Sequence, residues 1–317
     1  MDPAGLTAYG GAAAGHEGVL ADASGEIIVK PCTQAEADFY QETLLQHEDF
    51  TRFMPSFMGT LQLGAPANVA KTAAAQEMVA ENAGSEVLPG SKAHSKQLFG
   101  TKIKTELAIV LENLEHGFKH PSIMDIKLGS RLYDDDTAPD KVERMKKVSA
   151  ETTSGSLGFR NTGMRVWNGQ TTDVYDKFYG RQLTAENVGE SFQTFFRGLK
   201  AELPASAAAR ALKDIEADIR ELRKALETKE SRMYGASILV VYEGDGSALR
   251  EVMADQPRQT SKEAEDSEDE EAPPVTSKVK LIDFAHAHWT PGQGKDENVI
   301  AGLINVEKQM QALIQSA

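Results

Sequence analysis

The segment PSIMDIKLG, residues 121–129, carries a carboxylate and an ammonium group two residues apart, at Asp125 and Lys127. The remaining side chains are mostly apolar, so the segment predicts a buried β-strand. Side chains two residues apart on a strand point to the same face. Asp125 and Lys127 would therefore be presented together, with Ile123, while Met124 and its alternating neighbours face a core. Such a pair suits the transfer of an anionic group, although a local ion pair would give the same pattern.

Two other segments carry groups that would complete such a site. Lys30 ends an apolar run, and Glu36 follows six residues later on a predicted helix. A strand lysine held by a helix glutamate binds the nucleotide phosphates in protein kinases, and an ordinary surface lysine is the alternative. Asp283 leaves the apolar strand 279–284, where a carboxylate could hold Mg²⁺ on the phosphates. His286 lies three residues on, either as an acceptor contact or as an ordinary structural histidine.

Cationic side chains that could hold an anionic acceptor gather between residues 140 and 147. Lys141, Arg144 and Lys147 share one face of a predicted helix. A solvated basic face is the alternative, but a local cationic cluster is more informative in a chain of net charge −14. Arg165 adds a planar guanidinium group that suits phosphate. The sequence thus offers each group that phosphoryl transfer needs: a cation for the nucleotide, carboxylates for magnesium and cations for the acceptor.

The elements that must position these groups follow from the hydrophobic pattern. A strand–turn–strand unit from Gly18 to Lys30 precedes a helix over residues 34–50 and a buried strand over residues 105–111. A larger mixed half follows. Its strands are expected at 159–167, 237–242 and 279–284, and its helices at 184–199 and 212–226. This order is compatible with a two-lobed phosphotransferase that binds nucleotide between its lobes.

Composition excludes several classes of protein. The 317 residues suit one large or two modest domains, and 40% hydrophobic with 26% charged residues is ordinary for a globular protein. The single cysteine, Cys32, excludes an internal disulfide framework. No apolar run approaches the roughly 20 residues of a transmembrane helix, and the N-terminus does not resemble a signal peptide. With 34 basic against 48 acidic residues, we expect no direct nucleic-acid binding.

Three segments are expected to lack regular structure. Residues 1–15 are rich in Ala and Gly and predict a flexible N-terminus, and residues 64–96 predict a long surface loop. Residues 245–277 predict a disordered loop that contains the acidic run 261–272, with seven acids and one lysine. The run either serves only solubility or, because two serines lie among its acids, is a phosphorylation or partner-docking site.

Taken together, these segments resemble the inositol polyphosphate kinase family. PSIMDIKLG matches the family's Pro-x3-Asp-x-Lys-x-Gly signature, and LIDFAHAHW resembles its magnesium-binding strand. SLGFRNTGMRVW and GKDENVIAGLINV resemble two further family segments. The resemblance covers most of residues 15–306, except near 64–96 and 245–277. The short segment 129–158 and the histidine of Asp-Phe-Ala-His are similar to the multikinase branch of the compact fungal kind.

The resemblance implies an α+β, two-lobed fold, like that of protein kinases, which holds ATP between its lobes. Residues 16–113 would form the N-lobe with the nucleotide-binding hairpin and helix. Residues 114–317 would form the C-lobe, with a short inositol-phosphate-binding insert at 130–158. Broad acceptor specificity would follow from that short insert.

The resemblance also implies residue roles. Lys30 would contact the nucleotide phosphates with support from Glu36, and Glu112 and Leu114 would bind adenine through their backbone. Asp125 would bind the ribose and help to place the acceptor, Lys127 would bridge the acceptor and the transferred group, and Asp283 would hold magnesium. The remaining group would grip the inositol phosphates: Lys141, Arg144, Lys147, Arg165 and His286.

The function implied is ATP- and Mg²⁺-dependent phosphorylation of inositol 1,4,5-trisphosphate to tetrakis- and pentakisphosphate. Two alternatives stay open: an inositol hexakisphosphate kinase that makes pyrophosphates, and a nuclear transcription-complex scaffold with residual kinase activity. Inositol polyphosphates, phosphoinositide lipid head groups and transcription factors are the implied partners. The resemblance further implies a monomer in the nucleus and cytoplasm.

Overall fold

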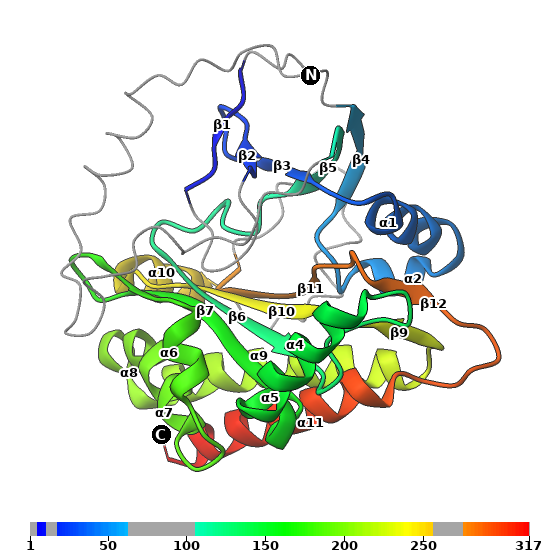
Figure 1. Cartoon of the computed structure of the whole chain (residues 1–317). Helices are drawn as coiled ribbons and strands as arrows, with labels where there is room; N and C mark the ends of the chain where they lie inside the picture. Colours follow the sequence, from blue (N-terminus) through cyan, green and yellow to red (C-terminus); the bar gives the residue numbers. More distant parts are fainter. Residues whose placement is uncertain (1–4, 11–17, 63–104, 256–274, 317) are drawn as a thin grey trace.

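The computed structural model describes residues 5–10, 18–62, 105–255 and 275–316. The loop expected at 64–96 and the acidic run 261–272 lie outside these residues. The described chain forms two lobes, each built on a five-stranded sheet (Figure 1). The family-like α+β fold expected from the sequence is confirmed.

The smaller lobe contains an antiparallel sheet and two helices. Its strands, in spatial order, are β1 (Thr7–Ala8), β2 (Leu20–Ala21), β3 (Ile27–Pro31), β5 (Leu107–Glu112) and β4 (Phe57–Gln62). Helix α1 (Gln34–Gln46) is capped by Thr33, whose hydroxyl accepts the N–H of Glu36. The helix expected over 34–50 instead ends at His47, and α2 (Glu48–Thr51) follows.

The N-terminus corrects one expectation. Residues 5–10 belong to the range expected to be flexible, yet β1 pairs with β2, and Tyr9 donates its N–H to the carbonyl of Val19 at 3.0 Å. Leu6 packs against the apolar outer face of the sheet, around Val29 and Val110. Pairing and packing therefore order a segment whose own composition indicates little structure.

The larger lobe has a mixed order of strands and helices. Its sheet contains, in spatial order, β11 (Ser277–Ile282), β10 (Ser237–Glu243), β6 (Pro121–Leu128), β7 (Phe159–Trp167) and β8 (Thr172–Tyr175). A short ribbon pairs β9 (Ser231–Met233) with β12 (Ala287–Trp289). The helices are α4 (Pro139–Ala150), α5 (Thr153–Leu157), α6 (Lys177–Gln182), α7 (Val188–Phe195), α8 (Arg197–Glu202), α9 (Ala205–Glu227), α10 (Gly246–Asp255) and α11 (Glu297–Gln315).

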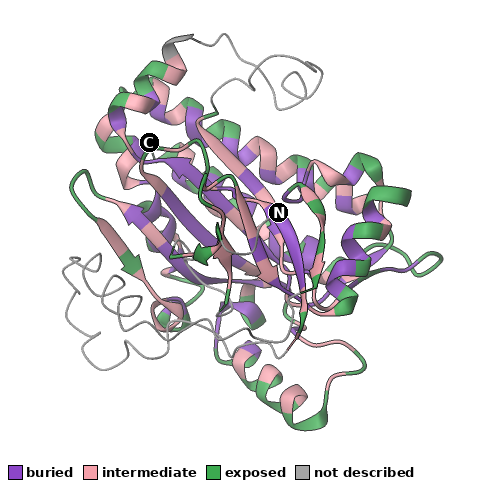
Figure 2. Ribbon diagram, turned by 90° about the horizontal axis from the view of Figure 1, so that it is seen from above, coloured by how far each residue is buried: buried purple, intermediate pink, exposed green. Residues whose placement is uncertain are grey.

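The two faces of the larger sheet have different neighbours. Helices α9 and α11 lie along one face, and the smaller lobe lies beyond the other (Figure 1). The central strands are largely buried, while the outer sides of the helices are exposed (Figure 2). Met124, Ile126 and Leu128 of β6 enter the main core, as their alternation predicts. That strand can therefore offer charged side chains only on the face toward the smaller lobe.

An aromatic block joins the two lobes. Phe39 of α1 stacks on Phe284 with ring centroids 4.8 Å apart and on Trp289 at 5.3 Å. Tyr40 meets the same Phe284 edge-on at 5.2 Å. These rings are almost fully buried and belong to one continuous hydrophobic core. Helix α1 is thereby anchored to the segment that follows β11.

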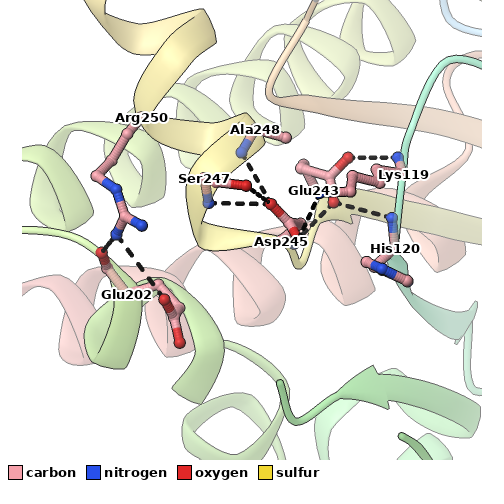
Figure 3. Close-up of polar contacts among 8 residues, drawn as sticks. All are labelled: Lys119, His120, Glu202, Glu243, Asp245, Ser247, Ala248 and Arg250. Carbon is pink, nitrogen blue, oxygen red and sulfur yellow. Dashed lines mark hydrogen bonds and ion pairs between the residues drawn. The ribbon is translucent and has the colours of Figure 1, made fainter. Parts of the chain in front are cut away.

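The connection between the lobes is held at the end of β10 (Figure 3). The buried carboxylate of Glu243 accepts the backbone N–H groups of Lys119 at 2.6 Å and His120 at 3.0 Å. Asp245 caps the next helix by accepting the N–H of Ala248 at 2.9 Å. Two N–H groups of a chain crossing between sheets are thus satisfied by one side chain.

Helix α10 corrects the expected loop at 245–277. The cap at Asp245 and the fully buried side chain of Leu249 order its first turns. Arg250 extends from α10 and donates to the carbonyl of Glu202 at 2.6 Å (Figure 3). The expectation for the remainder of the loop, up to residue 274, concerns residues that the structure does not describe. None of the helices in the described ranges has the length and apolar character needed to cross a bilayer.

A close backbone approach gives a stability prediction. A Cβ added at Gly180 in α6 would lie 1.8 Å from the carbonyl oxygen of Asn161 in β7. We expect Gly180→Ala to lower the free energy of unfolding by about 1–3 kcal/mol, because α6 would have to move away from the sheet. Urea unfolding followed by circular dichroism measures the change.

Gly189→Ala in α7 is the matched control. Its added Cβ would meet only the flexible end of Gln309, at 3.3 Å. We expect neutral or slightly higher stability, by up to about 1 kcal/mol, because alanine favours helix. Equal unfolding midpoints for the two variants would contradict the packing described here.

Candidate functional site

Charged side chains from both lobes meet in one cluster. Lys30 is the next-to-last residue of β3, Glu36 lies in the first turn of α1, and Asp283 follows β11. The Nζ of Lys30 lies 2.8 Å from Glu36 Oε1 and 2.8 Å from Asp283 Oδ1. The Nζ of Lys127 approaches Asp283 Oδ2 at 4.0 Å. Asp283 is thus placed between two lysines, one from each lobe, and the expected pairing of Lys30 with Glu36 is present.

The pair of Lys30 and Glu36 is almost closed to solvent. The Glu36 side chain is 1% exposed and also accepts the N–H of Phe284 at 3.3 Å. Burial alone would lower the pKa of Lys30, but the charges of Asp283 and Glu36 outweigh burial and raise this pKa well above its ordinary value. Lys30 is therefore a permanent cation with a fixed direction, which suits a contact to nucleotide phosphates.

Asp283 owes its direction to an unusual backbone. Its φ of 67° is left-handed, and it is the one such non-glycine residue in the described part of the chain. This conformation costs about 1–2 kcal/mol, although aspartate tolerates it better than most residues. The buried ring of Phe284 holds the turn in place through its stacking on Phe39. This left-handed backbone conformation directs the carboxylate away from β11 and toward Lys30 and Lys127.

Asp125 contributes a second carboxylate from the middle of β6. Its side chain is 4% exposed, and its Oδ1 has no hydrogen-bond partner among the described residues. Burial raises its pKa; Lys127 opposes this effect and the nearby Asp283 adds to it. A buried carboxylate oxygen without a partner is costly unless a ligand completes it. Asp125 is thus suited to receive a hydroxyl group or a cation.

The same carboxylates are the candidates for a divalent metal. Within the described ranges, no three His, Cys, Asp or Glu side chains form a complete metal cluster. Mg²⁺ is commonly held by one or two carboxylates together with substrate phosphates and water. The unpartnered oxygen of Asp125 and the adjacent Asp283 fit that incomplete donor set. Asp283, with Asp125 beside it, is the position that could hold such an ion.

A second group of polar side chains lies where α4 approaches the segment after β11. Lys141 Nζ is 3.4 Å from His286 Nε2, and His286 Nδ1 contacts Asp134 Oδ2 at 2.5 Å. Burial would raise the pKa of Asp134, but bonds from Thr137 and His286 lower it below its usual value. Asp134 stays ionised and fixes the histidine ring. Lys141 and His286 are thus brought together as expected.

The other basic residues of α4 take different positions. Arg144 and Lys147 are exposed, and Lys147 lies 3.9 Å from Glu151 on its own helix. In the part of the chain that the structure describes, neither forms an ion pair with the charged cluster. Of the three residues predicted to share a helix face, only Lys141 contacts His286 among the described residues.

Arg165 is placed away from this acceptor group. It lies opposite Ile123 in the pairing of β6 and β7, four residues from the row of Lys127. Four residues of a strand span about 13 Å. Its guanidinium Nη1 lies 3.2 Å from Glu115 in the connection between the lobes.

The structure reveals a cation that sequence reasoning missed. Arg160 lies directly opposite Lys127 in the sheet and is 8% exposed. Burial and the neighbouring Arg181 lower its pKa to about 10. Its Nη1 donates to Ser154 Oγ at 3.1 Å, and the charge of Asp125 partly opposes the lowering of its pKa. Such a buried guanidinium is suited to an anionic ligand.

The position of Arg160 could not be predicted from regular strand alternation, because β7 contains a β-bulge. Five residues separate Arg160 from Arg165, so regular alternation would place them on opposite faces. The register between β6 and β7 shifts after Asp125, which puts an extra residue in β7 and brings both arginines to the face of Lys127. Nothing in the local sequence marks this position.

Comparison with known proteins identifies the family. A family model described as inositol polyphosphate kinase matches residues 108–311. The chain belongs to the inositol polyphosphate kinase family. The matched residues run from β5 to α11 and contain Asp125, Lys127 and Asp283.

Individual relatives extend the match to the smaller lobe. Inositol polyphosphate multikinase of Saccharomyces cerevisiae is 32% identical over 345 aligned positions, which cover 92% of this chain and 94% of the yeast protein. Human inositol hexakisphosphate kinase 3 is 31% identical, but over 64% of this chain and 50% of its own length. A crystal structure of yeast inositol phosphate multikinase Ipk2 with ADP and Mn²⁺ is 27% identical, with a TM-score of 0.68, over 92% of this chain and all of that one.

The buried pair gives a second prediction. Glu36→Gln removes one of the two carboxylates that compensate Lys30. Removing a partner from a buried ion pair costs about 3–5 kcal/mol, and we expect a loss toward the lower end because Asp283 remains. Chemical denaturation gives the free energy of unfolding.

Asp38→Asn on the same helix is the control. Asp38 is exposed and contacts only Gln34 among the described residues, at 2.7 Å. We expect a change within about 0.5 kcal/mol. A Glu36→Gln variant as stable as this control would show that Lys30 does not need its helix partner.

Proposed function

We propose that the protein is an ATP-dependent inositol polyphosphate multikinase, which converts inositol 1,4,5-trisphosphate to tetrakis- and pentakisphosphate. The observation that carries the proposal is the position of Asp283 between Lys30 and Lys127 at the junction of the lobes. The near full-length similarity to the yeast multikinase supports this acceptor class. The ADP and Mn²⁺ in the similar yeast structure support the use of ATP and a divalent metal.

The nucleotide would bind along the connection between the lobes. The carboxylate of Glu112 is occupied by Lys278, at 3.1 Å, and by Ser56. The side chain of Leu114 is buried against Ile123. Both side chains are thus directed away, and the N–H of Glu112 donates to the carbonyl of Ser56 at 3.0 Å. The carbonyl of Glu112 and the backbone of Leu114 are therefore the candidates for adenine. Lys30, held by Glu36, would then contact the phosphates.

The chain's own residues supply charge and position for the transfer. Mg²⁺, when bound at Asp283 with Asp125 beside it, would neutralise part of the phosphate charge. Lys127 donates to the carbonyl of Gly235 at 2.5 Å, which aims its ammonium group at the junction. There it would stabilise the negative charge on the transferred phosphoryl group. Positioning and fixed charges supply most of the rate acceleration in this class of reaction.

The inositol phosphate would bind on the side of α4. Lys141 and His286 lie together there, and Lys127 with Arg160 opposite it in the sheet would supply further contacts. Arg144 and Lys147, on the exposed side of α4, would assist only at the outer rim. The connection from β6 to β7 contains the short helices α4 and α5 alone, so an open pocket would accept the ring in more than one orientation.

A second candidate is an inositol hexakisphosphate kinase. The similarity to the human hexakisphosphate kinase favours it, although this match covers less of both chains. Incubation with ATP, Mg²⁺ and trisphosphate, followed by positional analysis of the products, tests the first proposal. Pyrophosphate formed from hexakisphosphate as the sole acceptor, without turnover of trisphosphate, would select the alternative.

We further propose that the protein acts as a monomer in the nucleus and cytoplasm. Phosphoinositide lipid head groups and transcription-factor partners remain part of this proposal, and the acidic run 261–272 would suit a basic partner. A nuclear role that survives in a catalytically inactive variant would support scaffolding in addition to catalysis.

Asp283→Asn is the most direct test of catalysis. Asparagine also tolerates a left-handed backbone, and Lys30 keeps its contact with Glu36, so we expect a folded protein. Turnover should fall below detection because a neutral amide oxygen holds a divalent metal far more weakly than a carboxylate does. Near-normal turnover would remove Asp283 from this role.

Lys127→Ala tests the contact to the transferred group. We expect kcat/KM to fall by orders of magnitude, because the ammonium group would act mainly in the transition state. A loss below about tenfold, roughly 1.4 kcal/mol, would argue against this role. Lys146→Ala is the control, since Lys146 is exposed on α4 and pairs with Glu143 at 2.9 Å.

A further inference from the structure

Three side chains from distant segments meet beside the connection between the lobes. Tyr9 follows β1, Glu115 lies in the connection, and Arg165 lies on β7 of the larger lobe. The hydroxyl of Tyr9 donates to Glu115 Oε1. Arg165 Nη1 donates to both carboxylate oxygens of Glu115, at 3.2 and 3.3 Å. One carboxylate thus joins the first strand of the small lobe to a central strand of the large lobe.

This group is largely shielded from water. The Glu115 side chain is 15% exposed and that of Arg165 is 21% exposed. Burial raises the pKa of Glu115, and it also raises that of Tyr9 together with the charge of Glu115. Loss of one partner from such a group is costly because the others remain buried. Breaking this group is therefore expected to cost more free energy than breaking an exposed ion pair.

Asn113 extends the contacts to the β2–β3 turn. Its N–H donates to the carbonyl of Glu26 at 2.8 Å, and its Nδ2 donates to that of Gly25 at 2.7 Å. Its Oδ1 accepts the N–H of Glu115 at 3.1 Å and the hydroxyl of Tyr9 at 3.4 Å. Residues 113 and 115 are thus fixed by side-chain contacts. They alternate with 112 and 114, whose backbones are the candidates for adenine.

We propose that Tyr9, Glu115 and Arg165 form an interlobe clasp that positions the nucleotide side of the site. The clasp holds β1 and the backbone of residues 112–114 in a fixed relation to β7. It rests on the proposed function, in which a nucleotide binds between the lobes. None of the three is a catalytic residue, because they act through the backbone that receives the nucleotide.

The clasp assigns Arg165 a different role from the phosphate contact expected from its residue type. To reach an anionic acceptor, its guanidinium would have to leave Glu115, whose side chain is largely shielded from water. Its place opposite Ile123 also separates it from the row of Lys127. The two roles differ in a measurable way: a clasp residue changes the KM for ATP, whereas an acceptor contact changes the KM for the inositol phosphate.

Steady-state kinetics of Arg165→Leu, Glu115→Gln and Tyr9→Phe separate these roles. We expect Arg165→Leu to raise the KM for ATP about tenfold, which corresponds to 1.4 kcal/mol. The KM for inositol trisphosphate and kcat should change less than about twofold, or under 0.5 kcal/mol. Tyr9→Phe removes the hydroxyl that donates to Glu115 and Asn113 but leaves the ion pair of Arg165, so it should raise the KM for ATP by less. Glu115→Gln removes the negative charge of Glu115 and keeps nearly the same side-chain shape, so it tests the contribution of that charge.

Arg250→Leu is the matched control, because this exposed arginine pairs with Glu202 and with none of the three clasp residues (Figure 3). It should leave all three constants unchanged. A raised KM for the inositol phosphate in Arg165→Leu would overturn the clasp in favour of an acceptor contact. Unchanged constants in all three clasp variants would also overturn it. If Arg165→Leu does not fold, Tyr9→Phe and Glu115→Gln decide the question.

Hydrogen exchange provides a readout that does not depend on activity. The amides of Tyr9 and Asn113 donate to Val19 and Glu26 in the intact clasp. We expect faster exchange at both amides in the clasp variants and no change in Arg250→Leu. A wild-type protein that transfers no phosphate would refute the proposed function. Exchange would then decide whether the clasp exists, and unchanged rates would exclude it.

Discussion

The structure depends on the charge balance around Asp283. Lys30 is buried at the junction of the lobes, where an uncompensated ammonium group would be prohibitively unfavourable. Glu36 from α1 and Asp283 from the larger lobe, each at 2.8 Å, supply the compensation. Behind them, Phe39, Tyr40 and Phe284 form an aromatic contact that excludes water. The lobes are therefore joined by a charged contact that only their correct arrangement can satisfy.

The site around this contact has a rigid side and an open side. Toward the nucleotide, buried ion pairs and the connection between the lobes fix each backbone segment. Toward the acceptor, Lys141 and His286 approach from separate elements, and Arg160 is a buried cation that donates to Ser154 Oγ. The net charge of −14 is that of the whole chain. Local cations at the junction give the polyanionic acceptor a favourable environment despite that charge.

Several features could be predicted because they depend on local periodicity. The two-residue repeat of β6 places Asp125 and Lys127 on one face and Met124 on the other, as the strand pattern requires. Other features depend on distant partners. Helix α10 forms because the side chain of Leu249 is buried in the larger lobe, and β1 forms because it pairs with β2. Local composition alone indicated loops at both places, because burial by a remote element is absent from a sequence window.

The sequence by itself determined which residues could carry phosphoryl transfer and to which family the chain belongs. PSIMDIKLG and LIDFAHAHW carry the resemblance to that family, and both lie in local runs of the sequence. Only the tertiary structure decided which cations share the site. A β-bulge aligned Arg160 with Lys127, and the connection between the lobes drew Arg165 to Glu115. The physical reason is that charges are placed by strand register and by the partners that compensate them, and both are set by contacts between distant segments.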